Sequence, residues 1–281
     1  MIDVEMWVIV GLIAVVFKSA YQSGLNRFVA VDQPLAVTHS LSLVSSFLFG
    51  VIVIVVQPSA PPLWGVGLAA LAGVFLGLGL WSFTEALSVA DFSIVSPFQQ
   101  LIPIVTAIVE PVVIAQLGYR PAVVGGAVLV GIGAYVVLLE PSAPFAPIRN
   151  IQSKGPLLGI ATAILFGLAA IITSATTKQM SFPLYVFIQL VAAFTAISLI
   201  RRDLPRVNRN YALVGLLYTL NIGFSNFTLS LTAASNAVIV FRLSLLVNVL
   251  VGVLLFDEQG LLYRLIGALI IVAGIALTLF G

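Results

Sequence analysis

The sequence has no cysteine and only one histidine among 281 residues. Disulfides, thiolate metal sites and cysteine nucleophiles are therefore excluded, and so is a metal site built from several histidines. Charged residues are also scarce, at 8% of the chain, against about 25% in an average soluble domain. The net charge of +2 is too small for a basic surface that binds nucleic acid. Together these shortages exclude a soluble enzyme, a nucleic-acid-binding domain and a disordered chain.

Apolar residues make up 61% of the chain, and its mean hydropathy is +1.20. A helix that crosses a bilayer needs roughly 20 mostly apolar residues. We predict ten such helices, near residues 6–26, 34–56, 63–88, 92–116, 121–140, 155–178, 182–200, 210–231, 234–256 and 260–280. The expected fold class is therefore all-α, a polytopic membrane protein with short turns between its transmembrane helices.

The longest connection between the predicted helices is 141–154, at the midpoint of the chain. Its three prolines, Pro141, Pro144 and Pro147, are typical of a semi-rigid linker. The linker divides the chain into two sets of five helices, residues 1–140 and residues 155–281.

The two halves are similar in sequence. Residues 77–110 align without gaps on residues 221–254, with eight of 34 positions identical. In the last helix of each half, Gly126-Ala127 matches Gly267-Ala268. Because five is an odd number, the second copy has to enter the membrane from the opposite side. The pattern predicts an inverted 5+5 repeat, which recurs in transporters and places the substrate near the midplane between the halves.

Short motifs at these positions add a family resemblance. The resemblance rests on the segment Phe83–Ala90, on Pro103 in the fourth helix, and on Asp257-Glu258 followed by Gly267-Ala268 and Gly274. They resemble the corresponding motifs of the EamA-like permeases of the drug/metabolite transporter superfamily. The resemblance covers the whole chain. It implies a ten-helix secondary transporter, usually an exporter, that needs no cofactor.

The chain departs from the family pattern at three positions, and one of them is the first half's equivalent of Glu258, where no acidic residue follows the fourth helix and Gln116 is nearest. Val247 stands where a second proline is expected, and Lys18 occupies a part of the first helix that is usually small or aromatic. The substrate is not fixed by the resemblance, so the polar residues inside the predicted helices have to be considered one by one.

Charged side chains inside a bilayer cost about 2.5–3.5 kcal/mol on insertion scales, and they mark a functional site or an ion pair. Four fall inside the predicted helices, Lys18, Glu85, Glu110 and Arg242, with His39 as a titratable companion. At a helical rise of about 1.5 Å per residue, their depths allow two pairs, Lys18–Glu85 and Glu110–Arg242. Depth alone does not show that the members of a pair face each other.

Each of these residues has two readings. Lys18 and Arg242 either line a polar cavity or belong to structural pairs, and a guanidinium in a cavity would hold a carboxylate or phosphate through two hydrogen bonds. Glu85, Glu110 and His39 are the candidates for proton coupling. Alternatively, Glu85 is an interfacial carboxylate in water, Glu110 caps a helix end kinked at Pro111, and His39 is structural.

Amides and aromatic side chains complete the candidate site. Most lie at similar depths on the first, third, fourth, eighth and ninth helices. The predicted substrate-binding residues are Lys18, Tyr21, Gln22, Trp81, Gln99, Gln100, Asn221, Asn226, Arg242 and Asn248. Tyr218 is a further candidate for the cavity wall. The alternative for each amide is a hydrogen bond between helices, worth roughly 0.6–2 kcal/mol.

Glycines recur at a spacing of seven in the last helix of each half. Gly126 and Gly133 correspond to Gly267 and Gly274, and small residues at this spacing let helices pack closely. We interpret these two helices as scaffold. No glycine-rich nucleotide-binding motif is present, so direct use of ATP by this chain is not expected.

The orientation in the membrane stays open. We call the side reached after the first helix face A, and the side that holds both termini face B. Face A carries eight Lys and Arg residues and face B two, which puts face A in the cytoplasm by the positive-inside rule. The family resemblance implies the reverse.

The leading hypothesis is a secondary transporter in the plasma membrane for a small polar or amphipathic metabolite such as an amino acid, working by alternating access. The alternatives are a sugar or nucleotide-sugar exchanger and a non-transporting membrane scaffold or partner subunit. The expected partners are a small-molecule substrate and membrane lipid, without nucleic acid. Protons as the coupling ion, and a homodimer, are left open. The chain carries no enzyme signature, metal constellation or cofactor motif.

Overall fold

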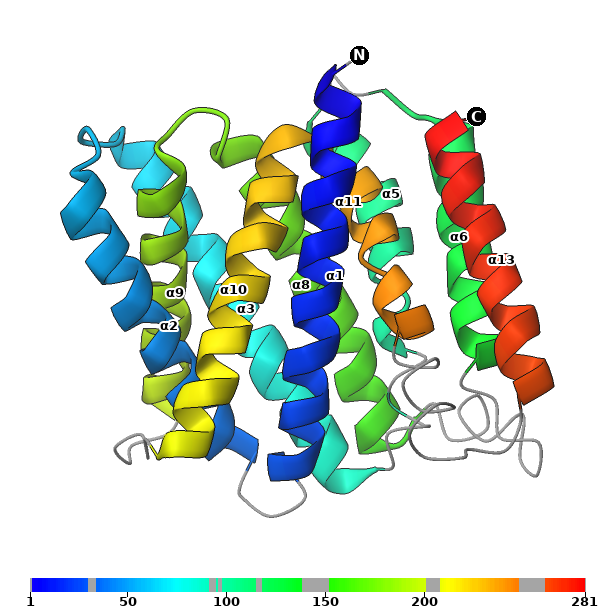
Figure 1. Cartoon of the computed structure of the whole chain (residues 1–281), viewed down its shortest axis with the longest axis horizontal. Coiled ribbons are helices and arrows are strands. Elements are labelled where there is room, and N and C mark those ends of the chain that lie inside the picture. The colour runs from blue at the N-terminus through cyan, green and yellow to red at the C-terminus, as the bar shows by residue number, and fades with distance from the viewer. Residues whose placement is uncertain are drawn as a thin grey trace.

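The computed structural model describes residues 2–29, 34–90, 95, 98–114, 118–137, 152–200, 208–247 and 261–280. Ten helices and no strand occur within these residues (Figure 1). They are α1 (Ile2–Val29), α2 (Pro34–Val56), α3 (Leu63–Val89), α5 (Ile102–Val113), α6 (Pro121–Val137), α8 (Lys154–Thr176), α9 (Phe182–Ile200), α10 (Arg209–Leu231), α11 (Ala234–Val240) and α13 (Leu261–Phe280). The prediction of an all-α fold is confirmed.

Each helix overlaps one of the ten predicted segments. Six of them, α1, α2, α3, α8, α9 and α10, are long and apolar enough to cross a membrane. Shorter apolar helices cover 102–113, 121–137, 234–247 and 265–278. The chain is therefore a polytopic membrane protein, and Figure 1 shows both labelled ends on the same side, face B. Most of the predicted linker 141–154 lies outside the described residues.

Helix ends follow local rules in the sequence. Pro34 and Pro121 are the first residues of α2 and α6, a position where the missing N–H breaks no hydrogen bond. At the start of α10 the side chain of Asn208 accepts a hydrogen bond of 2.8 Å from the backbone N–H of Tyr211.

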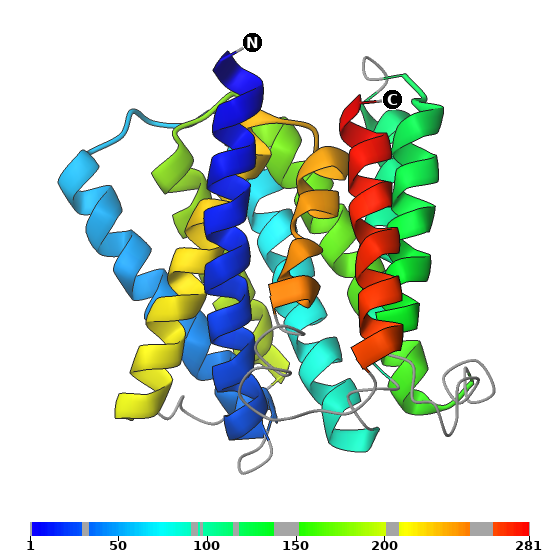
Figure 2. The ribbon, with the colours of Figure 1, turned by 45° about the vertical axis from the view of Figure 1, so that its right-hand side comes forward.

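The helices of the two halves pack in exchanged pairs. Helix α1 packs against α10, and its counterpart α8 packs against α3. Helices α2 and α9, which correspond to each other, are in contact, as are α6 and α13. Figures 1 and 2 both show α6 and α13 side by side at one edge of the bundle. If the two halves are exchanged, each of these helix contacts becomes a contact of the same set. A two-fold relation between the halves requires this.

Two of the predicted helices are interrupted. The predicted span 92–116 contains a turn at Gln100 and Leu101, after which α5 begins with Pro103 in its first turn. The predicted span 234–256 contains a turn at Phe241 and Arg242, where the backbone N–H of Arg242 bonds to the carbonyl of Ile239 over 3.1 Å. The prediction of two continuous helices was wrong here, because Pro103 offers no N–H to the preceding turn and the chain at Arg242 tightens locally.

Glycines bring α6 and α13 into backbone contact, as predicted for a scaffold pair. A Cβ atom added at Gly133 would lie 2.7 Å from the carbonyl oxygen of Gly267, and one added at Gly267 would lie 2.6 Å from the carbonyl oxygen of Gly133. Gly126 and Gly274 approach each other in the same way. Since the nearest atoms are backbone, they cannot move aside as a flexible side chain can.

We therefore expect Gly267→Ala to lower the free energy of unfolding by about 1–3 kcal/mol, the usual cost of overpacking. Gly67→Ala is the matched control, because Gly67 lies within α3 with no atom within 4 Å of the added Cβ. There the change should be neutral or stabilising by about 0.5–1 kcal/mol. Thermal unfolding of both purified variants in one detergent measures the difference, and equal midpoints would contradict the glycine contact.

Candidate functional site

A cavity of about 140 Å³ lies between the two halves of the bundle. Its walls come from α1, α3, α5, α8, α9, α10 and α11, so both halves contribute. Among its lining residues are seven of the ten predicted substrate-binding residues. These seven are Lys18, Tyr21, Gln22, Gln99, Asn221, Asn226 and Arg242. The structure therefore brings together residues from four separate predicted helices.

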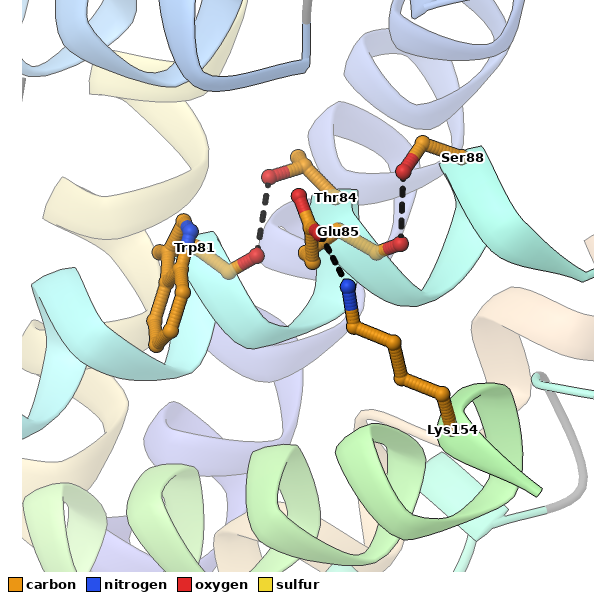
Figure 3. A network of polar contacts seen from close by, with 5 residues as sticks. All are labelled: Trp81, Thr84, Glu85, Ser88 and Lys154. Carbon is orange, nitrogen blue, oxygen red and sulfur yellow. Dashed lines mark hydrogen bonds and ion pairs between the residues drawn. The ribbon is translucent and has the colours of Figure 1, made fainter.

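The other three predicted residues differ in their placement. Gln100 does not line the cavity but bonds directly to Arg242, which does. Trp81 lies on α3 outside the lining and beside the segment that carries Glu85 (Figure 3). Asn248 lies outside the described residues.

Arg242 sits at the turn that ends α11, and its side chain is buried. Its Nη1 donates to Oε1 of Gln100 over 2.9 Å and to the carbonyl oxygen of Gln99 over 3.4 Å. Its Nε donates to the carbonyl oxygen of Val238 over 3.4 Å. The guanidinium thus joins the turn after α11 to the turn before α5, so the two helix interruptions meet at the cavity wall.

Lys18 lies on α1 and also lines the cavity. Arg242 lines the same cavity, so two basic side chains share this site. Among the described residues no carboxylate lines the cavity, and no ion pair involves either cation. The cavity therefore concentrates two positive charges without a countercharge from the described part of the chain.

Two tyrosines form the wall beside these cations. The rings of Tyr21 on α1 and Tyr218 on α10 meet edge to face, with centroids 5.3 Å apart. Tyr218 is buried, and its hydroxyl has no hydrogen-bond partner among the described residues. A buried hydroxyl is seldom left unpaired in a stable protein. The structure gives Tyr218 the wall position considered for it from the sequence, with a hydroxyl that has no partner among the described residues.

A second polar wall comes from α8, α9 and α10. Nδ2 of Asn226 donates to Oε1 of Gln189 over 2.6 Å, and Nε2 of Gln189 donates to Oγ1 of Thr173 over 3.1 Å. The hydroxyl of Tyr185 donates to the same Oγ1 over 2.8 Å. Of the residues joined by these hydrogen bonds, only Asn226 was among the predicted site residues. Gln189 is the one amide in the predicted helix 182–200, and that signal was available in the sequence.

Glu85 does not reach Lys18. Its Oε1 accepts a hydrogen bond of 2.7 Å from Nζ of Lys154, the first residue of α8 (Figure 3). The side chains of Lys154 and Glu85 are 63% and 30% exposed, so this pair lies at the edge of the bundle. The proposed Lys18–Glu85 pair was wrong, and the geometry agrees with the interfacial alternative for Glu85.

Glu110 does not pair with Arg242 either. Its two carboxylate oxygens accept hydrogen bonds from the backbone N–H groups of Ala234 over 2.6 Å and Ser235 over 2.8 Å. The side chain is fully buried, and it caps the start of α11 from α5. The proposed Glu110–Arg242 pair was wrong. A cap was the right alternative, but the capped helix belongs to the other half.

His39 is buried between α2 and α9. Its Nε2 lies 2.8 Å from the hydroxyl oxygen of Ser198, and its ring stacks on Phe194 with centroids 4.8 Å apart. None of the three proton-coupling candidates, Glu85, Glu110 and His39, is among the lining residues of the cavity. The described residues also contain no group of three or more potential metal ligands.

Comparison with protein-family models gives a match to the second half of the chain. The model of the EamA-like transporter family matches residues 153–280. No curated protein matches the chain. A solved chain described as "Crystal structure of protein" superposes with a TM-score of 0.76 over 98% of this chain and 96% of its own length. At 17% identity this structure shows a shared fold and nothing about the substrate.

The burial of Glu110 and the exposure of Glu85 lead to opposite expectations for stability. Glu110→Ala leaves two buried backbone donors without an acceptor and should lower the free energy of unfolding by about 1–3 kcal/mol. Glu85→Ala removes an exposed ion pair and should change it by less than about 1 kcal/mol. Thermal unfolding of the two variants gives the comparison, and an equal loss in both would refute the cap.

Proposed function

We propose that the chain is an EamA-like permease that carries a small polar or amphipathic metabolite through the Lys18–Arg242 cavity. The observation that supports this proposal is the convergence of two cations and several amides, from both halves, on one cavity at two helix interruptions. Discontinuous helices that meet between repeats are typical of substrate sites in secondary transporters. The family match supports the transport class.

The proposed mechanism is alternating access between the two halves. Helices α5 and α11 are in contact, and each begins or ends at an interruption beside the site. Such halves expose a shared site to either side of the membrane by rocking against each other. Export is the direction that the family resemblance implies, and we include it in the proposal.

The lining favours a substrate with one anionic end. The guanidinium of Arg242 and the ammonium of Lys18 suit a carboxylate or a phosphate. Asn221 and Asn226 offer amide contacts, while Leu76 and Phe166 offer an apolar surface. An amino acid is a familiar metabolite with such groups.

The size of the cavity bears on the alternatives. A cavity of about 150 Å³ holds a molecule the size of benzene. The observed volume of about 140 Å³ therefore suits a small metabolite. A nucleotide sugar is several times larger than benzene, so this conformation favours the smaller substrate. A scaffold role does not account for two cations in one cavity, because buried charges in a membrane are costly unless they bind a ligand or a partner.

The cellular setting is part of the proposal. The chain is a multi-pass membrane protein. The plasma membrane is the location that we propose, with the in/out orientation to be fixed by labelling of the two faces. Proton coupling through Glu85, Glu110 or His39 also remains a proposal, tested by flux under an imposed pH gradient with the corresponding glutamine variants.

Arg242→Gln should lower substrate flux about tenfold or more, since it removes a charged hydrogen-bond donor from the site. We would reconstitute the purified chain in proteoliposomes with labelled amino acids, organic anions, lipophilic cations and nucleotide sugars. Saturable flux of a small anion or amino acid, lost in Arg242→Gln, is the expected result.

Lys178→Gln is the matched control, because Lys178 is an exposed cation in the turn between α8 and α9. This variant should transport like the unchanged protein. Full flux in a folded Arg242→Gln variant would show that the cavity is not the transport site. Absence of flux for the whole panel would favour the scaffold.

A further inference from the structure

We propose that the substrate of this cavity is a small dianion, a dicarboxylate or a phosphate monoester, bound between Lys18, Arg242 and the hydroxyl of Tyr218. This inference rests on the proposed transport function and names its substrate class. It narrows the small polar metabolite of the proposed function to dianions, and it replaces the amino acid given there as an example. The juxtaposition that carries it is two cations and an unpaired buried hydroxyl around one cavity without a carboxylate in its described lining.

The charge balance of the site comes first. The titratable side chains that line the cavity are Lys18, Tyr21, Tyr218 and Arg242, so the described lining contributes two positive charges and no negative one. Like charges in a medium of low dielectric constant repel strongly. A dianion neutralises both cations, whereas a monoanion leaves one uncompensated. A zwitterion such as alanine has no net charge, so it leaves the total charge of the two cations unchanged. Its ammonium group also meets no carboxylate in the described lining.

The hydrogen-bond balance points the same way. Within the described residues, the hydrogen bonds of Arg242 use Nε and Nη1 on protein oxygens, and none uses Nη2. The hydroxyl of Tyr218 has no partner among the described residues, and no ion pair found there involves Lys18. The site therefore has a surplus of donors on α1, α10 and the turn after α11. Carboxylate and phosphate oxygens are acceptors that satisfy several donors at once.

Arg242 is also held in place for such a ligand. Its bonds to Gln100 and to the carbonyl of Gln99 fix one side of the planar guanidinium against the turn before α5. A guanidinium whose orientation is fixed before binding loses less side-chain entropy when the ligand arrives. Size adds a further limit, because about 140 Å³ accommodates a molecule near the size of benzene and excludes a long-chain or nucleotide-linked dianion.

The test is ligand binding to the purified full chain, measured by calorimetry and by the rise in unfolding temperature. Three probes separate charge from size and carboxylate from phosphate: succinate, its monoamide succinamate, and glycerol 3-phosphate. Succinate and succinamate differ by one charge at nearly equal size. We expect at least one of the two dianions to bind about tenfold or more tighter than succinamate, the ratio of one charged hydrogen bond. Which dianion binds tighter tells the dicarboxylate from the phosphate ester.

Two variants connect the preference to the named groups. Lys18→Met keeps the length of the side chain and removes its charge, so it should abolish the preference for the dianion and leave succinamate binding nearly unchanged. Lys18→Arg should restore the preference. Tyr218→Phe removes only the hydroxyl, which has no partner among the described residues, so it should fold normally and weaken dianion binding severalfold.

Several results would overturn the proposal. Equal affinity for succinate and succinamate, failure of both dianions to bind, or tighter binding of alanine would each exclude a dianion as the substrate. Unchanged dianion binding in folded Tyr218→Phe and Lys18→Met would exclude these two groups. Each of these results leaves the proposed transport function standing if Arg242→Gln still abolishes flux of the transported compound. Absence of flux for every compound would instead overturn the transport function itself.

Discussion

The structure depends on one constraint of the bilayer, that every backbone N–H and C=O within it must find a partner inside the protein. Continuous helices meet this constraint by themselves, and most of the chain is built from them. The turns before α5 and after α11 do not, and the guanidinium of Arg242 bonds to the carbonyl of Gln99 and to the side chain of Gln100 where they meet. The helix interruptions, the buried cation and the cavity are therefore one feature.

The intramembrane charges fall into two groups that are treated differently. Glu110 accepts hydrogen bonds from the N–H groups that begin α11, and Glu85 forms an ion pair with Lys154 at face A. Both contacts join one half of the protein to the other, at different ends of the bundle. Lys18 and Arg242 line the cavity with no carboxylate in its described lining. A charge kept without a countercharge is expensive in a membrane, which is why we assign it to ligand binding.

Rigid and adaptable parts of the fold are separated. Helices α6 and α13 lock together through backbone contacts at glycines, away from the cavity. The helices that line the cavity interact through longer polar side chains, such as the Asn226–Gln189–Thr173 chain. Hydrogen bonds between such side chains are modest in a membrane, so they can be exchanged for contacts to a substrate.

The sequence by itself determined the number, places and order of the helices, because hydropathy over about 20 residues is a local property. It also identified most of the polar residues that line the cavity, since polar residues in apolar helices are conspicuous. Only the tertiary structure decided which groups the buried charged side chains contact. Lys18–Glu85 and Glu110–Arg242 were compatible in depth but wrong, because position along a helix does not fix which neighbour its side chain faces. Gln189 and Pro103 were visible in the sequence as the one amide of its helix and as a helix breaker. Only the packing showed that Gln189 and the two interruptions meet at one cavity, because that depends on contacts between distant segments.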